Sequence, residues 1–392
     1  MTLYKKDYRT RKMEAYFDNS ATTKVYPAVK DIMIKVMEED YGNPSSLHMK
    51  GVEAERYIKK AQESVAKTLH CKPEELIFTS GGTESNNLAL IGTALAKRRL
   101  GKHIISTEIE HASVHATLDF LKSLGFEYTL IGTDEHGVID PAEVANAVRE
   151  DTILVSCMHV NNEIGAIEPV AEIAAAVKQK NPDIYMHVDA IQAYGKIPVN
   201  PAKIGADLVS ISGHKVHGPK GSGALFVKKG VLIRPIIYGG GQGNGMRSGT
   251  ENVPAIAGFG VAAEESFRDF DKKIETIKGV KDYLREKLTS LPDVYDNSGD
   301  APHIASFSFV GVRSEVMLHA LEDRGIYTSS GSACSSHKRA ASSVLTAIKL
   351  PKERLESTLR FSIGEDNTKE QVDYIFDVIS EMLPILRQFT RK

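Results

Sequence analysis

The sequence contains few cysteines. Three are present, Cys71, Cys157 and Cys334, and they lie far apart without forming a CxxC pair. An odd number of widely spaced cysteines is not typical of a disulfide framework, and structural zinc sites use closely spaced pairs. The sequence therefore favours neither a disulfide-stapled fold nor a zinc site, and we expect no bound metal.

The chain also lacks an excess of charge of one sign and lacks long hydrophobic runs. Lysine plus arginine number 49, against 51 for aspartate plus glutamate, whereas nucleic-acid binding usually needs a basic excess. No apolar run approaches the roughly 18 residues of a membrane span, and the basic first residues lead into no secretory signal. These absences predict a cytoplasmic protein whose partner is a small molecule, with no direct contact to nucleic acid or membrane.

What is present is an ordinary globular composition with a clear alternation of element types. Apolar residues make up 42% and charged residues 26% of the chain, which supplies a sizeable core and excludes whole-chain disorder. Between residues 75 and 230, short runs of strand-forming residues alternate with helix-like stretches, and several runs are apolar almost throughout. This pattern predicts an α/β fold with a mostly parallel sheet whose strands are buried on both faces.

The pattern changes after Pro254. Apolar residues recur at helical spacing from Phe267 to Leu291, which predicts one face of a long amphipathic helix. The strand-like runs IASFSFV and LRFSIG lie among helical stretches further along the chain. We therefore expect a second, smaller α+β domain.

The strongest single chemical signal is a lysine that follows an apolar strand. In SISGHKVHGPKGSG, Lys215 lies between His214 and a glycine-rich turn. Neighbouring dipoles and positive charge favour the neutral amine that a Schiff base needs, so Lys215 is the candidate covalent anchor. A lone lysine in a loop is otherwise a solvated surface charge, so its partners decide between these readings.

A carboxylate at the end of another apolar strand supplies such a partner. Asp189 in HVDAIQ ends a strand-like run. A carboxylate there needs a cation, and a protonated pyridinium nitrogen supplies one. Gln192, three residues later, is suited to hydrogen-bond the ring oxygen of the same cofactor. The alternative is that Asp189 caps the helix that follows.

A phosphate site is indicated by TSGGTESNN. A strand, a Gly-Gly turn and a helix start place free backbone N–H groups around Gly82 and Thr83, where an anion is stabilised. The alternative is ordinary helix capping by Thr83 and Ser80. The segment is neither a Walker loop nor a GxGxxG fingerprint.

Together, the motifs of this chain resemble those of a known enzyme family. They run in the order YFDNSATT, GNPSSLH, TSGGTESNN, EHASV, VNNEIG, HVDAIQ, SGHKVHGPKG, RSGTEN and SSGSACSS, from near Tyr16 to near Gly364. This series resembles cysteine desulfurases of the NifS/IscS type, which are pyridoxal-phosphate enzymes related to class V aminotransferases. The resemblance implies a homodimer with the fold-type I architecture of pyridoxal-phosphate transferases. It implies a large α/β domain that binds pyridoxal 5'-phosphate over residues 25–265, and a small α+β domain over residues 1–24 and 266–392.

The resemblance also implies a role for each matching residue. Lys215 would form the Schiff base and remove the α-proton, while Asp189 would pair with the pyridine nitrogen and Gln192 would contact the ring oxygen. His111 would stack on the cofactor ring and act in proton transfer; without the motif it would be read as a helix-start residue. The phosphate would be held by Gly82, Thr83, Ser212, His214 and, from the neighbouring subunit, Thr250.

Two further residues are implied to contact the substrate, L-cysteine. Asn162 in VNNEIG would contact both cofactor and substrate. Arg360 in LRFSIG would bind the substrate carboxylate, because a planar guanidinium suits that bidentate contact. Without the surrounding motifs, Arg360 would be read as an ordinary ion-pair partner.

Cys334 distinguishes a sulfur enzyme from other users of the same cofactor. It lies among small residues that are not expected to pack as a core element, in a mobile loop at about residues 327–340. Most free cysteines are buried small hydrophobes, and we assign that role to Cys157 and Cys71. The family mechanism implies that the Cys334 thiolate attacks the substrate sulfur and becomes a persulfide, and that L-alanine departs.

The acceptor of the sulfur stays open. The long form of the Cys334 loop resembles the group that serves iron–sulfur cluster assembly and tRNA or cofactor thiolation. The basic residues His337 and Lys338 depart from that pattern, so the sequence does not decide between an iron–sulfur scaffold and a thiolation enzyme as the protein partner.

Two other functions remain as alternatives. A selenocysteine lyase, or another β-eliminating pyridoxal-phosphate enzyme, would share every cofactor residue, although Cys334 argues against simple elimination. A non-catalytic scaffold would retain the fold, but the presence of Lys215, Asp189, Arg360 and Cys334 argues against it.

Overall fold

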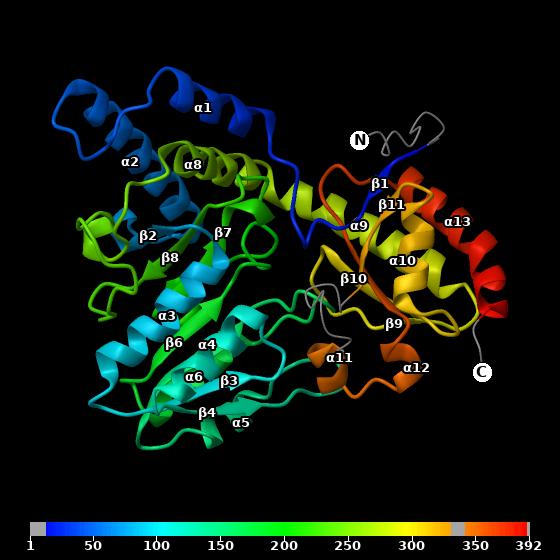
Figure 1. Cartoon of the computed structure of the whole chain (residues 1–392). Coiled ribbons are helices and arrows are strands. Elements are labelled where there is room, and N and C mark those ends of the chain that lie inside the picture. Colours follow the sequence, from blue (N-terminus) through cyan, green and yellow to red (C-terminus); the bar gives the residue numbers. More distant parts are fainter. Residues whose placement is uncertain (1–12, 331–341, 390–392) are drawn as a thin grey trace, which may run out of the picture. The chain divides into compact units, whose positions relative to one another are not determined.

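The computed structural model describes residues 13–330 and 342–389, and the chain divides into two compact units. The large unit comprises residues 22–162 and 166–270, and the small unit comprises residues up to 21, residues 163–165 and residues from 271 onward (Figure 1). These bounds differ by a few residues from the expected division near residues 25 and 265. Nothing in the sequence indicated that residues 163–165 belong with the two ends of the chain.

A seven-stranded sheet forms the centre of the large unit, in the order β2-β8-β7-β6-β5-β3-β4. The strands from β7 to β4 run parallel, whereas β8 is antiparallel to both β7 and β2. Every residue of β5 and β7 is buried, as expected for strands covered on both faces. The strands are β2 (Leu76–Thr79), β3 (His103–Thr107), β4 (Glu127–Ile131), β5 (Thr152–Met158), β6 (Tyr185–Asp189), β7 (Leu208–Ser212) and β8 (Gly223–Val227). The predicted α/β fold with a mostly parallel sheet is confirmed.

The helices of the large unit begin at recognisable signals. Asp140, Asn200 and Asn252 each accept a hydrogen bond from a backbone N–H group of the first turn that follows, which satisfies a donor that the helix cannot. Helix α3 packs against β5, β6, β7 and β8, while α1 and α2 pack against α8. The helices are α1 (Pro27–Glu38), α2 (Met49–Leu69), α3 (Gly82–Lys97), α4 (Ala112–Ser123), α5 (Pro141–Asn146), α6 (Val170–Lys180), α7 (Pro201–Ile204) and α8 (Val253–Phe267).

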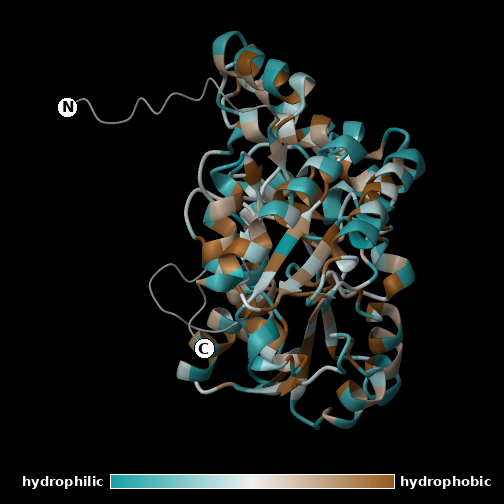
Figure 2. Cartoon of the chain, turned by 90° about the vertical axis from the view of Figure 1, so that its right-hand side faces the viewer, coloured by the Kyte–Doolittle hydropathy of each residue, from teal (hydrophilic) through white to brown (hydrophobic). Residues whose placement is uncertain are grey.

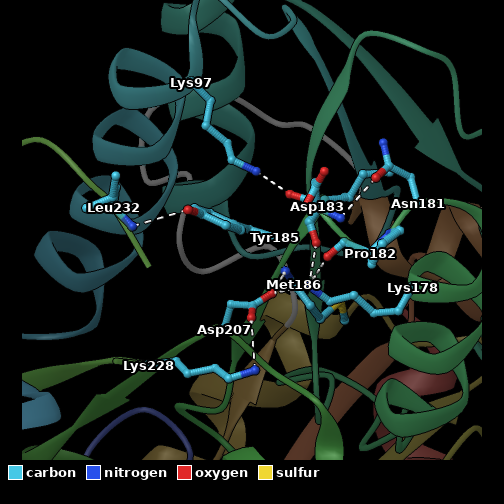
Figure 3. Close-up of polar contacts among 11 residues, drawn as sticks. Lys97, Lys178, Asn181, Pro182, Asp183, Tyr185, Met186, Asp207, Lys228 and Leu232 are labelled. Atoms are coloured by element: carbon cyan, nitrogen blue, oxygen red, sulfur yellow. Dashed lines mark hydrogen bonds and ion pairs between the residues drawn. The ribbon is translucent and has the colours of Figure 1, made fainter. Parts of the chain in front are cut away.

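A group of charged side chains surrounds the amino ends of β6 and β7 (Figure 3). Asp207 is buried and accepts hydrogen bonds from Lys178 Nζ at 2.6 Å and from the Met186 N–H at 2.9 Å. The ammonium group of Lys97 lies 3.5 Å from the centre of the Tyr185 ring and donates to the Asp183 carbonyl. These contacts occupy the amino end of the sheet, whereas Asp189 and Ser212 lie at its carboxyl end.

The small unit is built on a four-stranded antiparallel sheet in the order β12-β13-β10-β9. Its core includes Phe307, Phe309 and Phe361 from the sheet and Leu284 from α9. In Figure 2, brown hydrophobic positions follow the strands and alternate with teal ones along the helices. The elements are β1 (Ala15–Tyr16), α9 (Phe270–Thr289), β9 (Val294–Asp296), β10 (Ile304–Phe309), α10 (Ser314–Glu322), β11 (Ile326–Tyr327), β12 (Ser329–Ser330), α11 (Ser343–Ala347), α12 (Lys352–Leu355), β13 (Thr358–Ser362) and α13 (Lys369–Gln388).

The amphipathic helix predicted from Phe267 to Leu291 is confirmed as α9, except that Phe267 itself ends the preceding helix α8. Helix α8 ends at Phe267 and α9 begins at Phe270, because Asp269 adopts a left-handed conformation with φ of 53°. Hydrophobic spacing continues across this break and does not reveal it. Ile277 and Leu284 nevertheless lie on the buried face of α9, as the spacing predicts. Within the described residues, no helix combines the length and apolar character that crossing a membrane requires.

Candidate active site

Asp189 ends β6 of the large unit, and its carboxylate is buried. Its Oδ2 accepts a hydrogen bond from Asn86 Nδ2 at 2.7 Å, and its Oδ1 accepts one from the Ile191 N–H at 3.0 Å. Burial raises the pKa of Asp189, whereas these hydrogen bonds and the nearby charges of His111 and Lys215 act in the opposite direction. A buried carboxylate of this kind is suited to receive a cation.

A chain of hydrogen bonds connects Asp189 with His111. The Asn86 amide donates to Asp189 and also to Ser113 Oγ, at 2.9 Å. His111 precedes α4, and its Nδ1 lies 2.9 Å from Ser113 Oγ and accepts the Ser113 N–H at 3.1 Å. Because Nδ1 acts as an acceptor, the proton of the neutral ring lies on Nε2. The orientation of His111 is therefore fixed from the same amide that holds Asp189.

The sequence did not single out Asn86 or Ser113. Asn86 lies one helical turn after Gly82, in the TESNN part of the glycine motif, and Ser113 lies in EHASV. The available signals were the position of Asn86 one helical turn after Gly82 and the position of Ser113 two residues after His111. Neither signal reveals that the two side chains meet, because Asn86 and Asp189 are far apart in the sequence.

The Gly-Gly turn brings backbone close to the end of β7. Gly81 has φ of 148°, and a Cβ on Gly82 would approach Ile191 Cδ1 to 2.1 Å. The first N–H groups of α3 have no partner within their own helix. Ser212 Oγ is buried without a hydrogen-bond partner among the described residues and lies 4.0 Å from where a Cβ on Gly81 would stand. N–H groups at a helix start and a nearby unpartnered hydroxyl suit a phosphate group.

His214 and Lys215 lie in a short 3-10 turn, Gly213–Lys215, directly after β7. The His214 carbonyl accepts hydrogen bonds from the Thr23 N–H at 3.0 Å and from Thr23 Oγ1 at 2.9 Å. Burial lowers the pKa of His214 to about 4, so its ring is neutral at pH 7. Segments distant in sequence thus hold the turn in which Lys215 lies.

The remaining predicted residues of the large unit differ in exposure. Gln192 is buried after β6, and Asn162 is half-buried at the end of a large-unit segment. Thr250 is exposed and lines a cavity of about 200 Å³ together with Ser80 and Arg247. Arg247 also pairs with Glu84 of α3, with Nε to Oε1 at 2.9 Å.

Arg360 belongs to the small unit. It lies in the middle of β13, is largely buried, and its Nη2 contacts Asp18 Oδ1 at 2.8 Å. Cys334 lies outside the described residues. The structure therefore brings together His111, Asp189 and Lys215 in the large unit, and Gly82 near Ser212, and describes Arg360 within its own unit.

The other two cysteines are poor nucleophiles. Cys157 is fully buried in β5 and burial raises the pKa of its thiol well above the usual value. Cys71 is half-buried, and burial raises its pKa to about 12. Because the thiolate is the reactive form, neither residue is suited to nucleophilic chemistry at neutral pH.

Comparisons with known proteins show the family to which the chain is similar. The model of the family described as "Aminotransferase class-V" matches residues 15–375. A protein of Dictyoglomus turgidum named "Cysteine desulfurase IscS" is 45% identical over 380 residues, 96% of both chains. One of the same name from Methanosarcina thermophila is 42% identical over 97% of this chain and 95% of that protein.

Solved structures give the same picture. A chain titled "NIFS-LIKE PROTEIN" is 39% identical, with a TM-score of 0.91 over 95% of this chain and 100% of that chain. A structure titled "SspA in complex with cysteine" is 34% identical, with a TM-score of 0.80 over 90% of this chain and 100% of that chain.

Proposed function

The chain belongs to the aminotransferase class V family and is a pyridoxal-phosphate-dependent cysteine desulfurase, and we propose that Lys215, Asp189 and Cys334 carry its chemistry. It has the fold-type I architecture of that family. The structural observation that carries the proposal is the buried carboxylate of Asp189, which Lys215 is close enough to influence. A buried carboxylate costs free energy unless hydrogen bonds or a cation compensate it, which fits a role in binding a cation.

The residues of the large unit fit the chemical groups of pyridoxal phosphate. Gly82, Thr83 and Ser212 would hold the phosphate, since Ser212 has a buried hydroxyl without a partner in the described part of the chain. His214 would complete the phosphate site. Asp189 would receive the pyridine N–H, and Gln192 would contact the ring oxygen. When bound, the cofactor supplies an electron sink that lets a substrate α-proton leave.

The chain's own residues would then divide the work of the first half of the reaction. Arg360 and Asn162 would bind and orient L-cysteine, the arginine through the substrate carboxylate. The Lys215 amine would take the α-proton, and His111, whose ring is fixed by Ser113, would pack on the cofactor ring and move a proton through Nε2.

Cys334 would carry out the sulfur transfer. Its thiolate would attack the sulfur of L-cysteine, so that an S–S bond forms while the substrate Cβ–S bond breaks. The substrate Cβ takes the electron pair and a proton and becomes the methyl group of L-alanine. The persulfide on Cys334 balances this reduction, and no external oxidant is needed.

We further propose a homodimer in which Thr250 reaches the phosphate bound by the other subunit. Its exposure, and the cavity that it lines, are compatible with a contact from outside the chain. The protein that accepts the sulfur would be an iron–sulfur scaffold or a thiolation enzyme for tRNA or a cofactor, and the names of the relatives do not decide between them.

The test of this function is product stoichiometry. Purified protein with bound cofactor, supplied with L-cysteine and a reductant, is expected to release alanine and sulfide in equal amounts. Lys215→Ala and Cys334→Ala are expected to abolish both products, and Cys157→Ala, which removes a buried unreactive thiol, is the matched control. Release of sulfide with pyruvate by Cys334→Ala would instead identify a β-eliminating lyase.

A further inference from the structure

Residues 163–165 belong to the small unit, and backbone hydrogen bonds hold them there. The Gly299 N–H donates to the Ile164 carbonyl at 2.7 Å, and the Ala301 N–H donates to the Gly165 carbonyl at 2.9 Å. Lys281 of α9 is buried, and its Nζ donates to the carbonyls of Gly299 and Ala301 at 2.6 and 2.7 Å. The segment directly after Asn162 is therefore held by residues 299–301, and Lys281 in turn holds those residues in place.

Glu163, the first residue of this segment, contacts the residue at which the described chain resumes after Cys334. Ser342 Oγ donates to Glu163 Oε2 at 2.6 Å. The same Oγ accepts the Leu345 N–H at 3.1 Å and so caps α11. Ser342 is buried. One hydroxyl thus joins the start of α11 to the segment that follows Asn162.

Glu163 also lies close to Arg360 within the small unit. Both side chains line one small pocket, together with Leu345 of α11 and Thr358 of β13. Burial raises the pKa of Glu163, whereas the hydrogen bond from Ser342 and the charge of Arg360 lower it. The carboxyl group therefore stands between the cap of α11 and the proposed substrate-binding arginine.

We propose that Glu163 is a positioning residue for the sulfur-transfer step: by holding Ser342, it fixes the point at which the described chain resumes after Cys334, beside the pocket that Arg360 also lines. This role rests on the proposed function. Glu163 itself touches neither substrate nor the transferred sulfur in this account. Its loss is therefore expected to affect the attack by Cys334 and not the earlier steps at the cofactor.

The experiment separates these two stages in enzyme with bound pyridoxal phosphate, mixed with L-cysteine without reductant. Stopped-flow absorbance reports substrate binding and α-proton removal at the cofactor, and rapid quenching measures alanine formed in the first turnover. Because both variants remove the hydrogen bond between Ser342 and the Glu163 side chain, Glu163→Ala and Ser342→Ala are expected to slow alanine formation by about 10-fold. The absorbance change, which reports substrate binding and α-proton removal, is expected to be as fast in these variants as in the parent enzyme.

Conservative variants and a matched control complete the test. Glu163→Gln keeps an acceptor and Ser342→Thr keeps the hydroxyl, so both are expected to recover most of the alanine rate. Ser64 donates to Glu264 Oε1 at 2.6 Å between α2 and α8, a contact of the same kind in the large unit. Ser64→Ala is expected to leave both rates unchanged.

Three outcomes would overturn the positioning role. These are an undiminished alanine rate in Glu163→Ala and Ser342→Ala, an equal fall of both stages, and an equal effect of Ser64→Ala. A parent enzyme that forms no alanine at all would contradict the proposed function instead, so the two failures are distinguishable.

Discussion

Asn86 is the residue that connects the two sides of the proposed cofactor site. Its amide holds Asp189 and, through Ser113, also fixes the ring of His111. The positions of Lys215, Asp189 and Gly82 at strand ends and at a glycine turn were predictable from the sequence, and their roles stay proposals. Asn86 was not predictable, since an amide within a helix has no pattern of its own and its partner lies in a distant strand.

Replacement of Asn86 tests this connection. Asn86→Ala removes a hydrogen bond to a buried carboxylate, so cofactor affinity is expected to fall by about 10-fold. Equilibrium titration with pyridoxal phosphate measures the effect. Asn87→Ala is the matched control, because the Asn87 amide bonds only the Thr83 carbonyl of the same helix in the described structure. Equal losses in both variants would argue against a specific role of Asn86.

His159 predicts a dependence of stability on pH. Burial lowers the pKa of His159 to about 4, and its Nδ1 has no hydrogen-bond partner in the described structure. The unfolded chain therefore binds the proton more readily, so this contribution is complete above the unfolded pKa near 6.5 and is lost as pH falls toward 4. When the pH falls from 7 to 5, the free energy of unfolding is expected to drop in both proteins. The drop is expected to be about 1 to 2 kcal/mol smaller in His159→Gln than in the parent. Chemical denaturation at the two pH values measures this, and identical losses would contradict it.

At the scale of elements, hydrophobic patterning predicted the strands better than it predicted the breaks. Runs such as ILVSCM became β5 because a strand buried on both faces is apolar throughout. The separation of α8 from α9 depends on the extended Arg268 and the left-handed Asp269, which interrupt the backbone but not the spacing of apolar side chains. The attachment of residues 163–165 to the small unit depends on backbone hydrogen bonds, which leave no pattern in the sequence, and on the contact of Glu163 with Ser342, which lies far along the chain.

The start of α3 gives a prediction about an element rather than a side chain. In Gly82→Ala the new Cβ would press on Ile191 and displace the helix start, so weaker cofactor binding and lower stability are expected. The matched control is Gly279→Ala in α9, where a Cβ would meet nothing within 4 Å among the described residues. That variant is expected to be more stable by about 0.5 to 1 kcal/mol, because alanine favours the helix. Thermal unfolding and cofactor titration measure both, and similar behaviour of the two variants would contradict this account.

In the large sheet, the residues proposed to bind the cofactor and an ion pair that stabilises the fold lie at opposite ends of the strands. The carboxyl ends of β6 and β7 carry Asp189 and Ser212, and the amino ends carry an ion pair between the buried Asp207 and the partly exposed Lys178. The sequence predicted that Asp189 and Ser212 lie at strand ends, and their binding roles stay proposals. It did not predict the ion pair, because its members resemble solvated surface charges when read in isolation.

Removal of that ion pair is expected to lower stability without changing the site. Asp207→Ala leaves the Met186 N–H without its acceptor and removes the carboxylate that pairs with Lys178 and Lys228, so a loss of about 3 kcal/mol is expected. Arg149→Ala breaks exposed pairs with Glu127 and Asp151 and is expected to lower stability far less than Asp207→Ala. Denaturant unfolding compares them, and equal losses would show that the buried pair has no special role.

Locating the sulfur on the protein after one turnover tests most directly whether Cys334 receives it. Cofactor-loaded enzyme is mixed with L-cysteine without reductant, alkylated, digested and mapped by mass spectrometry. We expect one additional sulfur atom on the peptide that contains Cys334, together with an equal amount of alanine, and none on Cys71 or Cys157. Alanine formed without a persulfide on Cys334, or a persulfide on another cysteine, would contradict the account.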